Sequence, residues 1–301
     1  MKSQDETLVP VDVIDSHQHF WRFDPTEHTW MTEAQGVLKR DYLPADLAPD
    51  LARAGVSGTV AVQARRLLKE TEWLLELAAG EPFIRGVVGW FDFESRSLEA
   101  DLERLAENPL LVGARELIHD MPDVDYATSS SHVNGVRAVG RAGLAYDLLL
   151  KPQHLQAALT LADLLPEQRF VVDHLAKPRV ATGQHEPWAR DLRALAERAN
   201  VSCKLSGFVT EADWSDSRPA QFTPYFETVL GAFGPERVMF GSDWPVCLCA
   251  ASYGTVNDIV AAAITSLSAS EQAGVLGANA ARFYRLPPAR STGTQPAKRR
   301  T

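Results

Sequence analysis

A repeating alternation of short apolar runs and longer amphipathic stretches is the feature that most constrains the fold of this chain. The runs are rich in Val, Ile, Leu and Phe, as expected of parallel strands that are buried on both faces. The stretches between them, such as DLAPDLARAG and KETEWLLELAAG, carry apolar residues at three- and four-residue spacing and predict helices. Eight runs predict strands, at residues 11–19, 58–64, 83–91, 111–118, 144–150, 169–175, 201–207 and 237–245.

Eight strands that alternate with helices predict a (β/α)8 TIM barrel, a fold of the α/β class. An open, doubly wound sheet uses the same alternation, but it normally has a glycine-rich phosphate-binding turn after its first strand. The first run of this chain continues as DSHQHF, which contains no glycine. The barrel is therefore favoured, and a chain of 301 residues is long enough for one such domain.

The composition is that of a globular protein, with 45% hydrophobic and 23% charged residues. No stretch has the change in composition that is typical of a linker between domains. We expect a polar N-terminal segment over residues 1–10, one barrel domain over 11–286, and a disordered tail rich in Pro, Thr and Arg over 287–301.

The net charge and the cysteines limit the partners of the protein. The formal net charge of −9 repels nucleic acid and anionic membranes, and no apolar run is long enough to span a bilayer. Cys203, Cys247 and Cys249 form no CxxC pair, so neither a disulfide framework nor a zinc ribbon is supported. We expect a cytoplasmic protein that binds a small molecule, and homo-oligomerisation stays open.

Polar residues gather where the predicted strands end, which is where barrel enzymes place their catalytic groups. His17 and His19 are two residues apart on one strand, so their imidazoles point to the same side. A third imidazole, His174, follows the sixth strand, and Asp243 follows the eighth within FGSDWP. This set offers the nitrogen and oxygen donors of a zinc-type site, and Asp243 is a candidate general base. The alternative for Asp243 is a structural cap of the following turn.

Two cations lie on otherwise apolar strands, and each needs an anionic partner if it is buried. Arg115 and Lys204 are either ligands of a substrate carboxylate or oxyanion, or members of structural ion pairs with Glu116, Asp147 or Asp173. Sequence reasoning leaves both interpretations open. The candidate substrate-binding residues are Arg115, Lys204, His119, Trp21, Trp90 and Trp244.

The connection after the first strand is longer than usual and rich in aromatic residues. Its segment WRFDPTEHTWM, residues 21–31, is predicted to roof the substrate pocket and in part to pack against the barrel. The chain has no GxSxG, GxxxxGK[ST], GxGxxG or HExxH motif. His28, His132, His154 and His185 are interpreted as structural residues, and the cysteines as packing residues.

A set of motifs in order along the chain resembles one known family. IDSHQHFW, RDYLPADLAP, KETEWLLELA, VVGWFDF, RFVVDHLAKP, CKLSG, FGSDWPVC and GANAARFY are similar to the lactonase branch of the amidohydrolase superfamily. The resemblance runs from about residue 11 to 286. It implies a distorted barrel, addition of water to a sugar lactone or related cyclic ester, and an active-site core of His17, His19, His174 and Asp243.

The fourth strand departs from the family pattern, in which the segment commonly reads GxRHxxQDEPD. This chain has GARELIHDMPD, so Glu116 replaces a His, His119 a Gln and Met121 a Glu. The strand-four lysine and strand-five histidine of two-metal members are also missing. We therefore expect at most one divalent ion, zinc first, held by members of a set that includes Glu116: His17, His19, His174, Glu116 and Asp243. Catalysis without a metal stays open.

These features predict a lactone hydrolase in which Asp243 takes a proton from water while the histidines, with or without a metal, polarise the carbonyl. A pair between Glu116 and Arg115 would neutralise the arginine, which predicts a preference for neutral lactones over dicarboxylates. The alternatives are hydrolysis of another cyclic amide or ester, a decarboxylation, and a catalytically inactive barrel that serves as a binding subunit.

Overall fold

The computed structural model describes residues 12–216 and 218–288. Its eight strands form one sheet in which each strand is parallel to the next along the chain. All eight lie within the runs that the sequence predicts. Their bounds are β1 Ile14–Gln18, β2 Gly58–Val62, β3 Ile84–Gly89, β4 Leu111–Glu116, β5 Ala145–Leu148, β6 Phe170–Val172, β7 Val201–Leu205 and β8 Val238–Phe240.

The sheet closes on itself where the first strand meets the segment after the last. The His19 N–H donates to the Trp244 carbonyl at 2.7 Å, and the Asp243 N–H donates to the His17 carbonyl at 2.8 Å. The predicted (β/α)8 barrel is confirmed, and the open doubly wound sheet is wrong.

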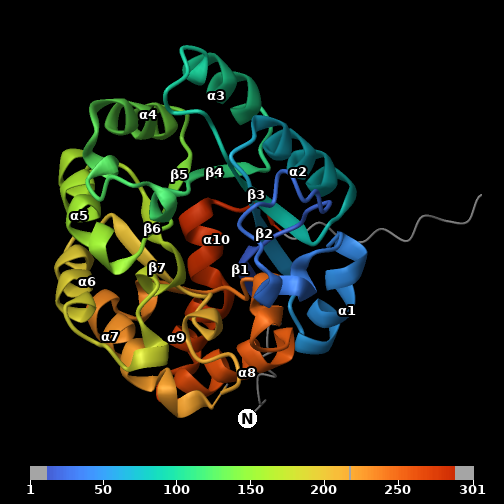
Figure 1. Ribbon diagram of the computed structural model, residues 1–301, viewed down its shortest axis with the longest axis vertical. Coiled ribbons are helices and arrows are strands. Elements are labelled where there is room, and N and C mark those ends of the chain that lie inside the picture. Colours follow the sequence, from blue (N-terminus) through green and yellow to red (C-terminus); the bar gives the residue numbers. More distant parts are fainter. Residues whose placement is uncertain (1–11, 217, 289–301) are drawn as a thin grey trace, which may run out of the picture.

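Helices surround the barrel, as Figure 1 shows. The amphipathic stretches that separate the apolar runs fold as predicted, with their apolar faces against the sheet. The bounds of the α-helices are α1 Pro44–Ala54, α2 Leu68–Gly80, α3 Leu98–Ala106, α4 Ser130–Arg141, α5 Leu155–Leu164, α6 Trp188–Ala196, α7 Thr223–Phe233, α8 Tyr253–Ala263 and α9 Ala269–Ala273, together with α10 Asn279–Tyr284, which does not belong to the surrounding layer.

The apolar core has two parts. The larger part lies between the sheet and the surrounding helices, and the smaller part combines strand residues with Ala280 and Tyr284 of α10. Figure 1 shows α10 at the centre of the ring of strands. One end of the barrel is therefore closed by α10, which leaves the other end for the polar residues that follow the strands.

The ends of the chain fall largely outside this description. The expected segment 1–10 and residues 289–301 of the expected tail lie outside the described residues, so these boundaries stay predictions. In the part of the chain that is described, no helix has both the length and the apolar character needed to cross a membrane.

Candidate active site

A cavity of about 270 Å³ opens among the loops that follow the strands. Its floor is polar, with His19, His174 and Asp243, and its walls carry the aromatic side chains of Trp21, Trp30 and Trp214. This position agrees with the rule that barrel enzymes build their sites at the carboxyl ends of the strands. The remaining lining residues are Gln35, Ala64, Arg115, Leu117, His119, Asp120, Leu149, Lys177, Thr210, Glu211, Val246 and Cys249.

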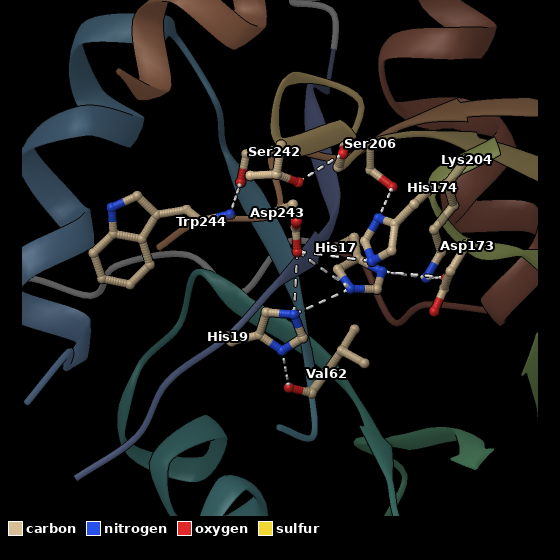
Figure 2. A network of polar contacts seen from close by, with 12 residues as sticks. His17, His19, Val62, Asp173, His174, Lys204, Ser206, Ser242, Asp243 and Trp244 are labelled. Carbon is tan, nitrogen blue, oxygen red and sulfur yellow. Dashed lines mark hydrogen bonds and ion pairs between the residues drawn. The ribbon is translucent and has the colours of Figure 1, made fainter. Parts of the chain in front are cut away.

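Three imidazoles meet one carboxylate at the floor of this cavity (Figure 2). The Nε2 atoms of His17 and His19 are 3.2 Å apart, and His19 Nε2 lies 3.3 Å from Asp243 Oδ1. The same oxygen is 3.9 Å from His17 Nε2 and 3.8 Å from His174 Nε2. The structure therefore brings together the four residues that the sequence proposed as the active-site core.

The outer nitrogen of each imidazole has its own partner, which fixes the orientation of the ring. His19 Nδ1 lies 2.7 Å from the Val62 carbonyl, and His174 Nδ1 lies 2.9 Å from Ser206 Oγ. His17 Nδ1 lies 3.2 Å from a carboxylate oxygen of Asp173. Such partners leave the Nε2 atoms directed at a common point, an arrangement typical of histidines that bind a metal.

Backbone conformation after β6 and β8 sets the direction of two of these side chains. His174 has φ of 54° and Asp243 has φ of 58°, both in the left-handed region that non-glycine residues seldom occupy. Gly207 makes room for His174, because a side chain at Gly207 would collide with the imidazole. Non-glycine residues in this region cost free energy and are frequent at functional sites.

The ionisation states of the active-site residues are those expected of metal ligands and of a proton acceptor. Burial lowers the pKa of His17 and of His174 well below the usual value, and nearby carboxylates only partly oppose this. Burial alone would raise the pKa of Asp243, but the proximity of His174 and the hydrogen bond from His19 bring it below its usual value. His17 and His174 are therefore neutral and Asp243 is ionised at neutral pH.

A buried ion network lies beneath the histidines. Lys204 Nζ donates to Asp147 Oδ2 at 2.6 Å and pairs with Asp173 Oδ1 at 2.9 Å. Arg115 Nη1 donates to Asp173 Oδ2 at 3.0 Å, and its Nη2 donates to the Gln63 carbonyl. Burial would raise the pKa of Asp173, but Lys204, His17 and Arg115 hold it well below its usual range. The sequence left open whether Arg115 and Lys204 bind substrate or form structural ion pairs. The structure shows both residues in ion pairs.

The donor set fits a divalent metal ion. The ligand atoms of His17, His19 and Asp243 lie within 4.8 Å of one another, and those of His17, Asp173 and His174 do likewise. Two nitrogens at about 2.0–2.1 Å from a tetrahedral zinc ion lie about 3.3 Å apart, which agrees with the spacing of the two Nε2 atoms. β5 offers no equivalent set of ligands for a second ion, because its carboxylate, Asp147, is bound by Lys204 and by Tyr284.

The predicted substrate-binding residues divide into two groups. Arg115, His119 and Trp21 line the cavity, and the aromatic loop after β1 contributes Trp21 and Trp30 to the lining. Lys204 is fully buried in the ion network and lies outside the lining. Trp244 also lies outside the lining, where it packs against Phe20 and Tyr42.

Two expectations for Glu116 need correction. Its carboxylate accepts hydrogen bonds from Arg66 Nε at 2.7 Å and from Trp90 Nε1 at 3.0 Å. It therefore does not neutralise Arg115, which pairs with Asp173, and it is absent from the candidate ligand groups found in the described residues. Glu116 instead ties the loop after β2 to β4, and Trp90 is engaged in the same contact.

Sequence reasoning missed Lys177, Glu211 and Trp214, which all line the cavity. Lys177 follows the end of β6 by five residues, and Glu211 follows the end of β7 by six. Their place shortly after strand ends is the signal that could have found them. These residues lie farther from the strand ends than the candidates that the sequence singles out, because the loops return to the cavity only after a turn.

The residues interpreted as structural have structural surroundings. His132 contacts the Tyr146 hydroxyl at 3.1 Å through Nε2, and His185 contacts Thr228 Oγ1 at 3.0 Å. Burial raises the pKa of the Cys203 thiol above its usual value and that of Cys249 to about 11. The thiols are therefore protonated, as expected of packing residues.

Comparison with known proteins identifies the class to which this fold and site belong. The Amidohydrolase family pattern matches residues 14–286, so the chain belongs to that family. Among curated relatives, an L-fucono-1,5-lactonase from Burkholderia ambifaria is 37% identical over 289 residues, covering 95% of this chain and 99% of the relative. An L-fucono-1,5-lactonase from Burkholderia multivorans is 40% identical over 287 residues, with 91% and 96% covered.

A solved structure agrees with these matches. The crystal structure of an amidohydrolase from Burkholderia multivorans with bound zinc has a TM-score of 0.86 and 39% identity, and covers 91% of this chain and 99% of its own. The expected family and its branch are thereby confirmed.

Proposed function

We propose that the protein hydrolyses a sugar 1,5-lactone and that L-fucono-1,5-lactone is the first substrate to test. The observation that carries the proposal is the convergence of the His17, His19 and His174 Nε2 atoms on Asp243 at the floor of a small cavity. The two relatives named L-fucono-1,5-lactonase, which match nearly the whole chain, support this choice of substrate.

The residues that would hold one divalent ion, zinc first, are His17, His19, His174 and Asp243. Such an ion, when bound, polarises a carbonyl oxygen and lowers the pKa of bound water. The chain's own contribution is to aim the three imidazoles at one point through Val62, Ser206 and Asp173, while burial keeps His17 and His174 neutral.

Asp243 is the proposed general base. Its carboxylate is buried and ionised, so it can accept a proton from the attacking water. The water oxygen then bonds to the lactone carbonyl carbon, the ring C–O bond breaks, and the proton passes to the departing ring oxygen. The product is the open hydroxy acid, and no oxidant or reductant takes part.

The walls of the cavity suit one sugar ring. Trp21, Trp30 and Trp214 supply apolar faces for its C–H groups, while polar groups between them can meet its hydroxyls. His119 is one such group, because it lines the cavity and burial lowers its pKa to about 4, so that its imidazole is neutral at neutral pH. A neutral imidazole can donate to or accept from a hydroxyl.

Substitution of the base tests the mechanism. Asp243→Asn keeps the side-chain volume but cannot take the proton, so kcat/KM for L-fucono-1,5-lactone should fall by well over about tenfold. Unchanged circular dichroism and unfolding temperature serve as the control for folding. A variant with more than about a tenth of the wild-type value would contradict general-base catalysis by Asp243.

Metal analysis tests the ligand set. Purified protein should contain about one zinc ion per chain, and removal by a chelator should abolish turnover that added zinc restores. His19→Ala should lose the metal, whereas Glu116→Gln should keep it because Glu116 contacts Arg66 and Trp90 instead. Two ions per active chain, or zinc loss in Glu116→Gln, would overturn this assignment.

A further inference from the structure

An ion pair forms part of the cavity wall beside the histidines. Lys177 Nζ donates to Glu211 Oε1 at 3.1 Å, and both residues line the cavity. Their side chains are 20% and 23% exposed, so they are accessible from the cavity yet largely withdrawn from bulk water. Glu211 is the carboxylate that Lys177 contacts within the described part of the chain.

The pair is carried by the loops that hold His174. Lys177 ends the left-handed run that begins at His174, and its N–H donates to the His174 carbonyl at 2.7 Å. Glu211 ends a short 3-10 helix, Val209–Glu211, that begins two residues after Gly207, the close neighbour of His174. Backbone contacts thus fix both partners relative to the active-site core.

The charge of Lys177 acts on the residues around the cavity. Burial lowers the pKa of His119 and of His174, and Lys177 lowers both further. It also helps to offset the effect of burial on Asp243. Lys177 lines the cavity with a partly exposed side chain, whereas Arg115 is almost fully buried, so Lys177 is the cation best placed to meet a negatively charged group of a bound substrate.

The cations of the lining already have partners. Arg115 pairs with Asp173 and Lys177 pairs with Glu211. The lining also carries the carboxylates of Asp120, Glu211 and Asp243. An anionic substrate would have to displace one of these partners, whereas hydroxyl groups could bond to the ion pair without separating it.

We propose that the Lys177–Glu211 pair is a specificity element that favours neutral, hydroxyl-bearing lactones and disfavours lactones that carry a carboxylate. The inference rests on the proposed lactone hydrolysis and adds to it the residues that select the substrate. Its physical basis is different from the expected Glu116–Arg115 pair, which the structure does not contain.

The test compares two lactones with the same ring: L-fucono-1,5-lactone, and its analogue in which a carboxylate replaces the C6 methyl. Glu211→Gln removes the partner of Lys177 and leaves the ammonium free for the carboxylate. The kcat/KM for the carboxylate-bearing lactone, divided by that for the neutral lactone, should rise at least about tenfold. Spontaneous hydrolysis is subtracted in each case.

Two further variants isolate the effect of the freed charge. Glu72→Gln removes one of the two carboxylate partners of Arg104, which lies 2.8 Å away on the outside of the barrel, and should leave the ratio unchanged. Lys177→Met combined with Glu211→Gln should return the ratio to the wild-type range. An unchanged ratio in Glu211→Gln, or a rise that persists without Lys177, would overturn the proposal.

Binding provides a readout that is independent of turnover. Calorimetry with the two corresponding 1,5-lactams, which resist hydrolysis, should show the same shift in relative affinity in Glu211→Gln. A protein that shows the binding shift but hydrolyses neither lactone would contradict the proposed function and support the specificity element. Turnover of the neutral lactone without a shift in relative lactam affinity would support the proposed function and contradict the specificity element.

Discussion

Buried charge is the residue-scale feature that supports the active site. Lys204 lies 3.0 Å from His17 Nδ1 and bonds to Asp147 and Asp173, all of which are fully buried. Burial raises the pKa of Asp147 to about 6 even though Lys204 opposes the shift. The sequence indicated that Lys204 needed an anion. It could not say which one, because the partners come from β5 and from the turn after β6.

Lys204→Met tests the cost of breaking this network. The variant would leave two buried carboxylates without their shared cation, so we expect the free energy of unfolding to fall by about 3–5 kcal/mol. Urea denaturation at neutral pH measures the change. Lys177→Met removes a partly exposed pair and should cost no more than about 1 kcal/mol. Similar losses in the two variants would contradict the role assigned to Lys204.

At the scale of the elements, the strands were predictable but their ends were not. The run 169–175 predicts a strand that reaches Leu175, yet β6 ends at Val172 and a left-handed turn begins at His174. Likewise β8 ends at Phe240, before Asp243. Apolar patterning reports burial and therefore finds strands. It does not reveal left-handed backbone at residues other than glycine, which tertiary contacts impose.

The packing of α4 against the barrel depends on a neutral histidine. The ring of His132 lies against Tyr126 and Phe93, with centroids 4.9 and 5.2 Å away, and Nε2 contacts the Tyr146 hydroxyl. Burial lowers the pKa of His132 to about 4. The His132 imidazole is therefore protonated only near pH 4 in the folded protein, whereas in the unfolded chain it is protonated near its ordinary pKa of 6.5.

This difference makes stability depend on pH. The contribution of His132 is complete above pH 6.5 and is lost as the pH falls toward 4, by about 3 kcal/mol in total. Urea denaturation at about pH 7 and about pH 4.5 should show a smaller loss in His132→Phe than in the wild type. An equal loss in the two proteins would contradict the assignment.

At the scale of the whole molecule, the C-terminal helix joins the closed end of the barrel to the active site. The Tyr284 hydroxyl of α10 donates to both carboxylate oxygens of Asp147, at 2.8 and 2.7 Å. Asp147 in turn holds Lys204 beneath His17. The sequence predicted the barrel from its repeat, but this plug lies outside the repeat and was not foreseen.

Gly277 lets the segment before α10 approach the start of β1, and its substitution tests how much the plug contributes. A side chain at Gly277 would collide with the Asp12 carbonyl, so Gly277→Ala should lower the free energy of unfolding by about 1–3 kcal/mol. Gly231 is a matched control, because it lies exposed in α7 with open space around it. Gly231→Ala should instead raise stability by about 0.5–1 kcal/mol, since alanine favours a helix. Urea midpoints compare the two variants. A steric collision at Gly277 would give the two substitutions changes of opposite sign in the free energy of unfolding. Equal changes would therefore mean that the close contact at Gly277 does not hold α10 in place.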